Sequence, residues 1–325
     1  MIVTKTPLRI SLTGGGTDFA GFYRHHPGRV VSCTIDKYVY VIIKERFDKK
    51  IRLGYTRTEM VDSVDELQHE LVRESMRLVG VSQSVEISTM ADIPSEGSGL
   101  GSSSAVTVGV LHALHALKGE LVTAEQLAQE ACRVEIDILG KPIGKQDQYI
   151  AAYGGVREFV FNQDDTVSVS RLFLEGDRWQ RLGEYIMLFF TGITRQSSTI
   201  LSKQKQNIEK KMDALKQMAE QARKTRELLE SNAPLARVGR IMHEGWELKK
   251  SLAEGIADEK IDAAYERALD AGAVGGKIAG AGGGGFLMLF CGPDRQAAVR
   301  SALSDMRELE FSLERDGSKV LLNGR

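Results

Sequence analysis

A stretch of small residues near the middle of the chain has the composition of a phosphate-binding loop. Residues 97–105 read Gly-Ser-Gly-Leu-Gly-Ser-Ser-Ser-Ala and lead into an apolar segment, 106–117, with helical spacing. Glycine lets the main chain approach an anion, and the first turn of a helix offers free backbone N–H groups and a partial positive charge. The pattern predicts a cradle for phosphate, although a Gly/Ser turn before a well-capped helix explains the composition equally well.

The signatures of two other phosphate-handling classes are missing from the sequence. It contains no Gly-x-x-x-x-Gly-Lys-Ser/Thr, the P-loop of nucleotide hydrolases. It also lacks His-Arg-Asp and Asp-Phe-Gly, and residues 18–20, Asp-Phe-Ala, miss the latter by one residue. These absences argue against a P-loop enzyme and against a protein kinase.

Two further glycine clusters stand at the ends of the chain. Residues 275–285 read Gly-Gly-Lys-Ile-Ala-Gly-Ala-Gly-Gly-Gly-Gly and precede an apolar, strand-like segment, 286–291. Glycine loses backbone freedom on folding, so four in a row indicate that something needs close access to this backbone. A tight turn, the alternative, needs only one or two glycines. The other cluster, Gly-Gly-Gly-Thr-Asp at residues 14–18, ends an alternating segment, 2–12.

The elements that must hold these loops follow from the periodicity of the first half. Segment 2–12 alternates and is rich in β-branched residues, which predicts a strand that ends in the glycine loop. Segments 30–35 and 38–44 repeat the pattern around Asp36 and Lys37 and predict a hairpin. Thr123 and Gln126 form a capping box for a helix that reaches about residue 139. The other expected elements are helices over 62–79 and 103–117 and strands over 85–89 and 156–161.

The second half begins where polar residues interrupt the apolar pattern, at 162–166 and 175–181. A domain boundary is expected there, with residues 1–170 in an N-terminal domain and 171–325 in a C-terminal domain. A buried strand over 185–191 and a long amphipathic helix over 196–231 follow. The remaining expected elements are helices over 234–252, 258–271 and 294–306 and short strands over 286–291, 311–315 and 320–322.

Composition limits the class of protein. A chain of 325 residues with 42% apolar and 27% charged residues suits two ordinary globular domains. The 43 basic and 44 acidic residues leave a net charge of -1, so the charge balance favours neither nucleic acid nor an anionic membrane as a partner. Three widely spaced cysteines suit a reducing compartment. With no apolar run long enough for a membrane span and no signal-peptide pattern, the expected location is the cytoplasm.

The three glycine motifs, in this order along the chain, resemble those of the GHMP kinase superfamily, named for galactokinase, homoserine kinase, mevalonate kinase and phosphomevalonate kinase. The resemblance covers essentially the whole chain. It implies an α+β, two-domain fold, in which the N-terminal, ATP-binding domain is like ribosomal protein S5 domain 2 and the C-terminal domain is ferredoxin-like. It also implies an active site between the two domains.

Within this superfamily the sequence looks closest to the bacterial kinases of D-glycero-D-manno-heptose 7-phosphate. It shares their Gly-Gly-Gly-Thr-Asp, at 14–18, and their Gly-Lys-Gln-Asp-Gln-Tyr, at 144–149. Galactokinases carry Glu and His where Gly15 and Gly16 stand here, and mevalonate kinases lack the Thr-Asp pair. The resemblance implies an ATP-dependent, Mg²⁺-assisted enzyme that phosphorylates the anomeric hydroxyl to give the 1,7-bisphosphate, on the way to nucleotide-activated heptose for surface polysaccharide.

The resemblance also implies roles for individual residues. Asp147 would face the acceptor hydroxyl, and Arg9 and Lys145 would stabilise developing charge. Without the family match, Asp147 reads as a surface carboxylate beside Lys145. The residues expected to bind ATP phosphates are Gly97, Gly99, Leu100, Gly101, Ser102, Ser103 and Ser104. The residues expected to contact the sugar phosphate are Gly15, Gly16, Thr17, Asp18, Gly282, Gly283, Gly284 and Arg195, the last of which is equally well explained as a solvated surface charge.

The metal ligands implied by the family are Ser103 and Glu135. Magnesium takes oxygen ligands, few of them from protein, so one hydroxyl and one carboxylate are sufficient. Glu135 precedes Asp147 by twelve residues, a slightly longer spacing than the family pattern, which leaves Asp137 as an alternative on another helix face. Ser104 is the alternative to Ser103.

Two other functions are compatible with the same motifs. The first is another sugar kinase of the family, acting on fucose or a hexose and differing only in the lining of the pocket. The second is a non-catalytic member that binds ATP and sugar as a regulator, against which the retention of Glu135 and Asp147 argues. The expected partner is a small sugar phosphate, and the sequence leaves open whether the chain is a monomer or a homodimer.

Overall fold

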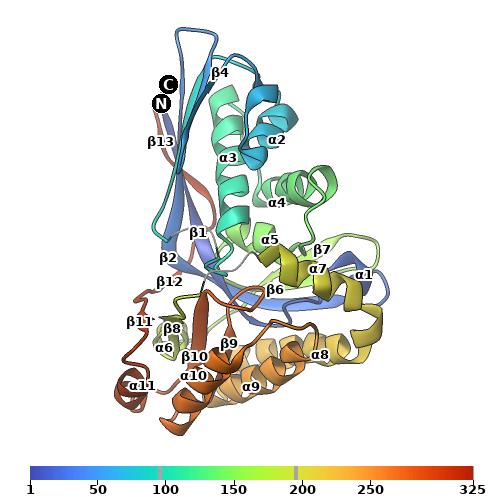
Figure 1. Ribbon diagram of the computed structural model, residues 1–325, viewed down its shortest axis with the longest axis vertical. Helices are drawn as coiled ribbons and strands as arrows, with labels where there is room; N and C mark the ends of the chain where they lie inside the picture. Colours follow the sequence, from blue (N-terminus) through green and yellow to red (C-terminus); the bar gives the residue numbers. More distant parts are fainter. Residues whose placement is uncertain (94–96, 194–196, 325) are drawn as a thin grey trace.

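The computed structural model describes residues 1–93, 97–193 and 197–324, and within them the chain forms two antiparallel-rich sheets flanked by helices (Figure 1). The larger sheet of this described part has nine strands in the path β13-β1-β2-β5-β3-β4, with β6, β7 and β12 attached through β2. Its strands are β1 (Ile2–Thr13), β2 (Gly28–Glu45), β3 (Ile51–Gly54), β4 (Thr58–Val61), β5 (Val85–Ala91), β6 (Val156–Phe161), β7 (Val167–Arg171), β12 (Leu313–Glu314) and β13 (Lys319–Asn323).

Strand β2 is one continuous strand, so the hairpin expected around Asp36 and Lys37 is wrong. The pairing of β1 with β2 steps from Leu8↔Ile35 to Pro7↔Tyr38, which leaves Asp36 and Lys37 in an irregularity of the ladder. Pro7 has no N–H to donate there, and this explains why the register breaks without a turn. The hairpin is instead formed by β1 and β2, with helix α1 (Ala20–Tyr23) in the connection.

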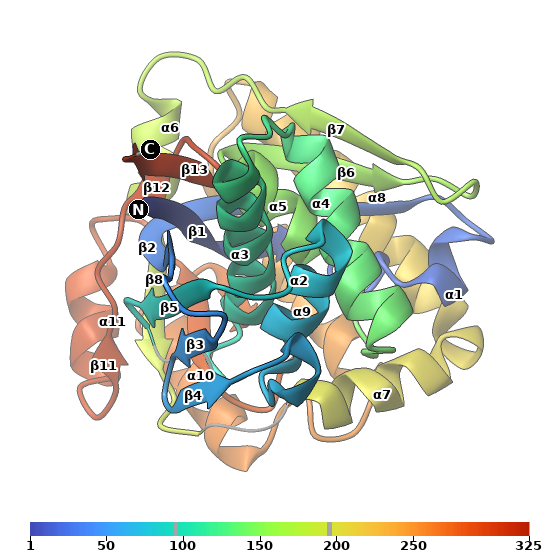
Figure 2. The same ribbon diagram turned by 90° about the horizontal axis from the view of Figure 1, so that it is seen from above.

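Four helices cover one face of the large sheet: α2 (Glu70–Val79), α3 (Ser102–Lys118), α4 (Ala124–Cys132) and α5 (Gln146–Tyr153). Helix α3 packs on β1 and β2 and touches the other three helices (Figure 2). It starts after Gly101 and ends before Gly119, both in the left-handed conformation with φ of 77° and 79°. The expected helix over 103–117 is thus confirmed, and its start points at the centre of the molecule.

Half of the capping box predicted at the start of α4 is present, because the Thr123 hydroxyl accepts a hydrogen bond of 3.1 Å from the Gln126 N–H, whereas the Gln126 side chain donates to Glu130. The helix does not continue regularly to residue 139. It widens into a π-helical segment, Arg133–Ile138, in which Glu135 is buried. Such π-bulges often occur at functional sites, where they re-aim a side chain.

The smaller sheet of the described residues has four strands in the order β11-β8-β10-β9. They are β8 (Ile186–Phe190), β9 (Gly275–Ile278), β10 (Phe286–Phe290) and β11 (Arg307–Glu308), and α6 (Arg178–Glu184), α10 (Glu259–Asp270) and α11 (Gln296–Ala302) belong to the same part of the chain. Helix α9 (Ala236–Lys250) packs on β9 and β10 and against α8 (Met212–Glu230), which in turn contacts β1 and β2. The α8–α9 pair therefore joins the two sheets.

The single helix expected over 196–231 is two helices. Helix α7 (Ser197–Asn207) is separated from α8 by a 3₁₀ turn, Glu209–Lys211. No proline or glycine marks the break in the sequence. Ile208, just before the turn, is buried against Gly21, and this contact between distant parts of the chain anchors the corner.

The C-terminal strands return to the first sheet. Strand β13 pairs with β1 and β12 pairs with β2, which brings the two ends of the chain together (Figure 1). The last residues of the expected 171–325 domain thus complete the N-terminal sheet, while the division at residue 170 itself stays a prediction. The α+β architecture is confirmed. In the described part of the chain, no helix combines the length and the apolar character that a membrane crossing would require.

Candidate active site

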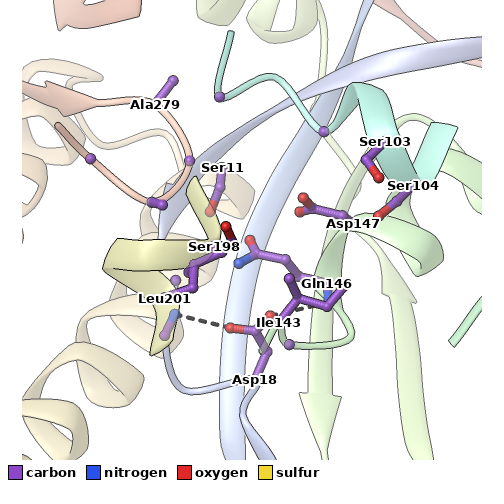
Figure 3. A pocket seen from close by; sticks show the side chains of 18 of the residues that line it. Ser11, Asp18, Ser103, Ser104, Ile143, Gln146, Asp147, Ser198, Leu201 and Ala279 are labelled. Atoms are coloured by element: carbon purple, nitrogen blue, oxygen red, sulfur yellow. Dashed lines mark hydrogen bonds between the residues drawn. The ribbon is translucent and has the colours of Figure 1, made fainter. Parts of the chain in front are cut away.

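The three glycine motifs meet at one cleft of about 430 Å³, a usual size for a small-molecule site (Figure 3). The end of β1, the loop before α3 and the π-helical segment form part of its wall, and α5, α7, α9, β9 and the loop between β9 and β10 form other parts. The residues with sequence-predicted roles that line it are Arg9, Gly15, Gly16, Asp18, Gly97, Gly99, Gly101, Ser102, Ser103, Ser104, Glu135, Asp147, Gly282 and Gly284.

The loop before α3 owes its path to glycine. Gly97, Gly99 and Gly101 have φ of 71°, 72° and 77°, a backbone region that residues other than glycine rarely adopt. A Cβ on Gly99 would lie 2.4 Å from the carbonyl oxygen of Ala279. A Cβ on Gly285 would lie 2.6 Å from the carbonyl oxygens of Gly97 and Ser98. The second glycine cluster therefore approaches the backbone of the first as well as the cleft.

The first turn of α3 presents its serines in different ways. Ser103 is exposed and faces the cleft, while Ser102 is buried, with its hydroxyl 3.1 Å from that of Ser98. The Ser104 hydroxyl donates 3.1 Å to Glu135 Oε2. The Leu100 side chain is fully buried and its carbonyl oxygen accepts from the Arg9 N–H, so its expected contact with ATP phosphates stays a prediction for its backbone N–H alone. Leu100 thus anchors the loop to β1.

Asp147, in the first turn of α5, is held by a bidentate pair with Arg9. Arg9 Nε lies 2.7 Å from Oδ1 and Nη2 lies 2.6 Å from Oδ2, while Nη1 donates 2.5 Å to the carbonyl oxygen of Gly99. Paired N–H groups on a carboxylate fix its orientation. The guanidinium thereby links the carboxylate to the glycine loop.

Lys145 does not have the geometry that its expected role requires. Its ammonium donates 3.0 Å to the carbonyl oxygen of Asp165 and lies 4.9 Å from the centre of the Tyr23 ring. Lys145 immediately precedes α5, and its side chain points toward the β6–β7 turn, which contains Asp165. The cations that line the cleft are therefore other residues.

Two of these cations are Lys249 of α9 and Lys277 of β9, which line the cleft and were missed by the sequence reasoning. Burial lowers the pKa of Lys249 to about 8 and that of Lys277 well below its usual value, and neighbouring positive charges add to both shifts. The only signal for Lys277 was a charged residue inside a glycine-rich segment before a buried strand. Lys249 had none, because a lysine near the end of an amphipathic helix is ordinarily solvated.

The Gly-Gly-Gly-Thr-Asp loop brings Asp18 to the cleft floor. Its carboxylate accepts from the N–H groups of Gly16 at 2.9 Å and Gln146 at 3.2 Å, and burial raises its pKa (Figure 3). A Cβ on Gly144 would lie 2.0 Å from this carboxylate, which accounts for that glycine. Thr17, which was expected to contact the sugar phosphate, has another role. Its buried hydroxyl donates to the carbonyl oxygens of Gly14 and Arg29 and so ties the loop to β2.

Ser11 and Gln146 are further lining residues that the sequence reasoning missed (Figure 3). Among the described residues, the Ser11 hydroxyl and Gln146 Oε1 are buried without a hydrogen-bond partner. Buried polar atoms are normally satisfied, so these two are available to a polar ligand. Of the remaining expected residues, Gly283 donates its N–H to Ile256 and is not among the described lining residues, and Arg195 lies outside the described residues.

Glu135 lies on the α3 side of the cleft and is fully buried. Oε1 accepts 2.6 Å from the Thr107 hydroxyl, and Oε2 accepts from Ser104 and, at 3.3 Å, from Gln148. Burial raises the pKa of this carboxyl. Within residues 1–93, 97–193 and 197–324, no cluster of three or more His, Cys, Asp or Glu side chains could hold a metal by itself.

These donors fit a magnesium ion that also takes phosphate oxygens, because Glu135, Ser103 and Ser104 are hard oxygen donors on one side of the cleft. Asp137 is exposed, which does not support it as the alternative ligand.

A second cavity, of about 670 Å³, adjoins the first. The two share Glu70, Ser103 and Lys141, so the first turn of α3 lies between them. The second cavity is lined in part by Tyr55 and His69, whose rings meet edge to face with centres 4.8 Å apart.

Comparison with known proteins gives the following matches. Residues 64–155 match the family model of the GHMP kinases N-terminal domain and residues 218–308 that of the GHMP kinases C-terminal domain. The chain is 30% identical to D-glycero-alpha-D-manno-heptose 7-phosphate kinase of Campylobacter jejuni, over 98% of both chains. It is 27% identical to L-fucokinase/L-fucose-1-P guanylyltransferase of Bacteroides fragilis, over 91% of this chain and 35% of that protein.

A solved structure resembles the whole chain. The crystal structure of a D-glycero-D-manno-heptose 1-phosphate kinase from Bacteroides thetaiotaomicron superposes with a TM-score of 0.83 at 26% identity, covering 100% of both chains.

Proposed function

Because the chain belongs to the GHMP kinase family and resembles its sugar kinases over the full length, we propose that it phosphorylates D-glycero-D-manno-heptose 7-phosphate at the anomeric hydroxyl. ATP is the phosphoryl donor of the family, and the product would be the 1,7-bisphosphate. The reaction would serve nucleotide-activated heptose synthesis for surface polysaccharide, in the cytoplasm, where ATP is available. The observation that carries the proposal is the carboxylate of Asp147, aimed by Arg9 beside the glycine loop.

ATP would lie across the two cavities. Backbone N–H groups of 97–104 and the start of α3 would hold the phosphates, as helix N-termini do. The base would occupy the second cavity beside Tyr55 and His69. Glu135 with Ser103 or Ser104 would hold Mg²⁺, which supplies charge neutralisation and alignment of the phosphates.

The sugar would occupy the space between Asp18 and Asp147. Asp147 accepts the proton of the anomeric hydroxyl as the phosphoryl group arrives, and Arg9 keeps the carboxylate oriented. Asp18, Ser11 and Gln146 bind sugar hydroxyls, since each presents an oxygen to the cleft. Positioning and preorganised charge provide most of the rate enhancement.

Activity on a substrate panel tests the proposal. We expect kcat/KM for the heptose 7-phosphate with ATP and Mg²⁺ to exceed that for the unphosphorylated heptose, for fucose and for hexoses by about a hundredfold or more, because a site built to pair a polar group rejects analogues that lack it. A preference for a free sugar would contradict the heptose assignment. The similarity to the fucokinase makes a fucose-type kinase the second candidate. A preference for free fucose would support that candidate.

A further inference from the structure

Lys249 and Lys277 stand out among the lining residues because they are buried cations with few partners. They are 5% and 6% exposed, respectively. The Lys249 ammonium donates to the carbonyl oxygen of Gly280, whereas Lys277 has no hydrogen bond or ion pair with any residue in the described part of the chain. Buried charges are normally paired, so an ammonium left without a partner beside a cleft indicates that a ligand completes its surroundings.

The charges around the two lysines do not compensate them. The guanidinium of Arg9 adds a further positive charge beside both lysines, and it is already paired with Asp147. The carboxylate of Asp18 also acts on both lysines, and its oxygens already accept from backbone N–H groups. The C-terminal wall of the cleft therefore carries a local excess of positive charge, and an anion would be bound there.

This wall lies apart from the expected metal ligands, and it meets the glycine loop where the β9–β10 loop approaches Gly97, Ser98 and Gly99. Lys249 and Lys277 belong to α9 and β9, whereas Ser103, Ser104 and Glu135 belong to α3 and the π-helical segment. Figure 3 shows Ala279, which follows the strand of Lys277, well apart from Ser103 and Ser104, with Asp147 and Ser11 between the two sides.

We propose that Lys249 and Lys277 bind the phosphate monoester that the sugar substrate already carries. The inference rests on the proposed function and adds to it the residues that select a phosphorylated sugar over a free one. Two ammonium groups suit a phosphate dianion, which accepts charge-assisted hydrogen bonds on three oxygens. With the sugar phosphate at this wall, the other end of the sugar faces Asp147 and the transferred phosphoryl group.

A binding experiment on the full chain tests the site without turnover. In the presence of a saturating non-hydrolysable ATP analogue, inorganic phosphate is expected to raise the Tm of the parent protein. Lys249→Met and Lys277→Met are expected to lose this shift, while Lys250→Met, whose lysine pairs with Glu247 and Asp262 on the surface, keeps it. If the analogue abolishes the phosphate shift in the parent, the lysines serve the nucleotide and the proposal is overturned.

Kinetics separate this proposal from the proposed function. For an enzyme that accepts heptose 7-phosphate, each variant should raise the KM for that substrate about tenfold or more, leave the KM for ATP unchanged and lose the preference over free heptose. An unchanged KM with a lower kcat would overturn the inference while leaving the proposed function intact. An enzyme that prefers a free sugar would contradict the proposed function, and the phosphate-binding experiment would still decide whether the lysines form an anion site.

The stability of the variants without ligand distinguishes a binding role from a structural one. Removing a buried, unpaired cation should leave the Tm of Lys277→Met equal to or above that of the parent. A lower Tm would show that Lys277 supports the fold, and this would overturn its assignment as a phosphate ligand. Lys249→Met and the charge-preserving Lys277→Arg would then test the anion site independently.

Discussion

Asp147 depends on Arg9 for its position, and this pair gives the most direct prediction at the scale of residues. Asp147→Asn keeps the size of the side chain and removes the proton acceptor, so kcat should fall about a hundredfold or more. The affinity for ATP should change little, because Asp147 lies beside the phosphate loop rather than in it. Steady-state kinetics with both substrates measure these effects. Asp213→Asn, an exposed carboxylate on α8, is the control, and equal effects of the two changes would remove Asp147 from the mechanism.

Lys249 should make stability depend on pH. Its pKa is lowered by burial from 10.5 to about 8, so the unfolded chain binds this proton more tightly than the folded one. The resulting penalty on the folded state, about 3 kcal/mol, is fully present below pH 8 and disappears as the pH rises through 8 toward 10.5. Arg9, Asp18, Asp147 and Lys277 are the charged groups whose fields act on it.

The comparison of Lys249→Met with the parent isolates this effect from other titrations. The variant should be more stable near pH 7, and the difference in Tm should shrink toward pH 10. Thermal unfolding at both pH values measures it. A variant that is less stable than the parent near pH 7 would contradict a buried, uncompensated ammonium.

The sequence predicted the site residues that lie within recognisable motifs and gave no indication of those that lie outside them. Arg9, Asp18, Glu135 and Asp147 stand in recognisable motifs, and the structure brings all four to one cleft. Lys249 could not be predicted, because its burial arises from the packing of α9 on a sheet formed by distant segments. Lys145 and Thr17 show the reverse: each is a motif position whose side chain contacts the backbone of another segment and does not line the cavity.

At the scale of elements, the glycine loop before α3 gives a prediction about backbone geometry. Gly99→Ala combines a positive φ of 72° with a Cβ placed 2.4 Å from the Ala279 carbonyl oxygen. Gly176→Ala is a matched control, since its φ is 58° and nothing lies within 4 Å of the added Cβ. The control should cost about 1–2 kcal/mol from backbone strain alone.

Gly99→Ala should cost clearly more and should weaken ATP binding, because the loop must move away from the β9–β10 loop. Chemical unfolding gives both free energies of unfolding, and titration with ATP gives the affinities. Equal costs for the two changes would show that the close approach of the two loops has no energetic importance.

The elements themselves were predicted where local signals are strong. The helix over 103–117, the N-cap at Thr123 and the strand over 156–161 agree with the structure within a residue or two. The continuous strand β2 and the corner between α7 and α8 were not predictable in the same way. Both depend on contacts with distant segments, Pro7 of β1 in one case and Gly21 in the other.

At the scale of the whole molecule, the C-terminal strands tie the end of the chain to its beginning. Strand β13 pairs with β1 from Ile2 to Lys5, and Glu314 of β12 accepts from the Tyr38 hydroxyl at 2.5 Å. Deletion of residues 313–325 should expose the edge of β1. The loss of this strand pairing should lower the Tm. Thermal unfolding measures the loss.

A shorter deletion, of residues 324–325 only, leaves β13 in place and serves as the control. If the long deletion unfolds at the same temperature as the control, the return of the chain to the first sheet contributes nothing to stability. The pairing of β13 with β1 had no signal in the sequence, because strand partners separated by some three hundred residues are set by topology rather than by local pattern.

The central claim is that the cleft transfers a phosphoryl group from ATP to the anomeric oxygen of a heptose 7-phosphate. Phosphorus NMR of a reaction with ATP, Mg²⁺ and the heptose 7-phosphate tests it most directly, because it shows which oxygen receives the phosphate. The account predicts a second sugar phosphate resonance coupled to the anomeric proton, formed in equal amount with ADP and about a hundredfold more slowly with Asp147→Asn. ADP formed with inorganic phosphate alone, or a new phosphate on another sugar carbon, would contradict it.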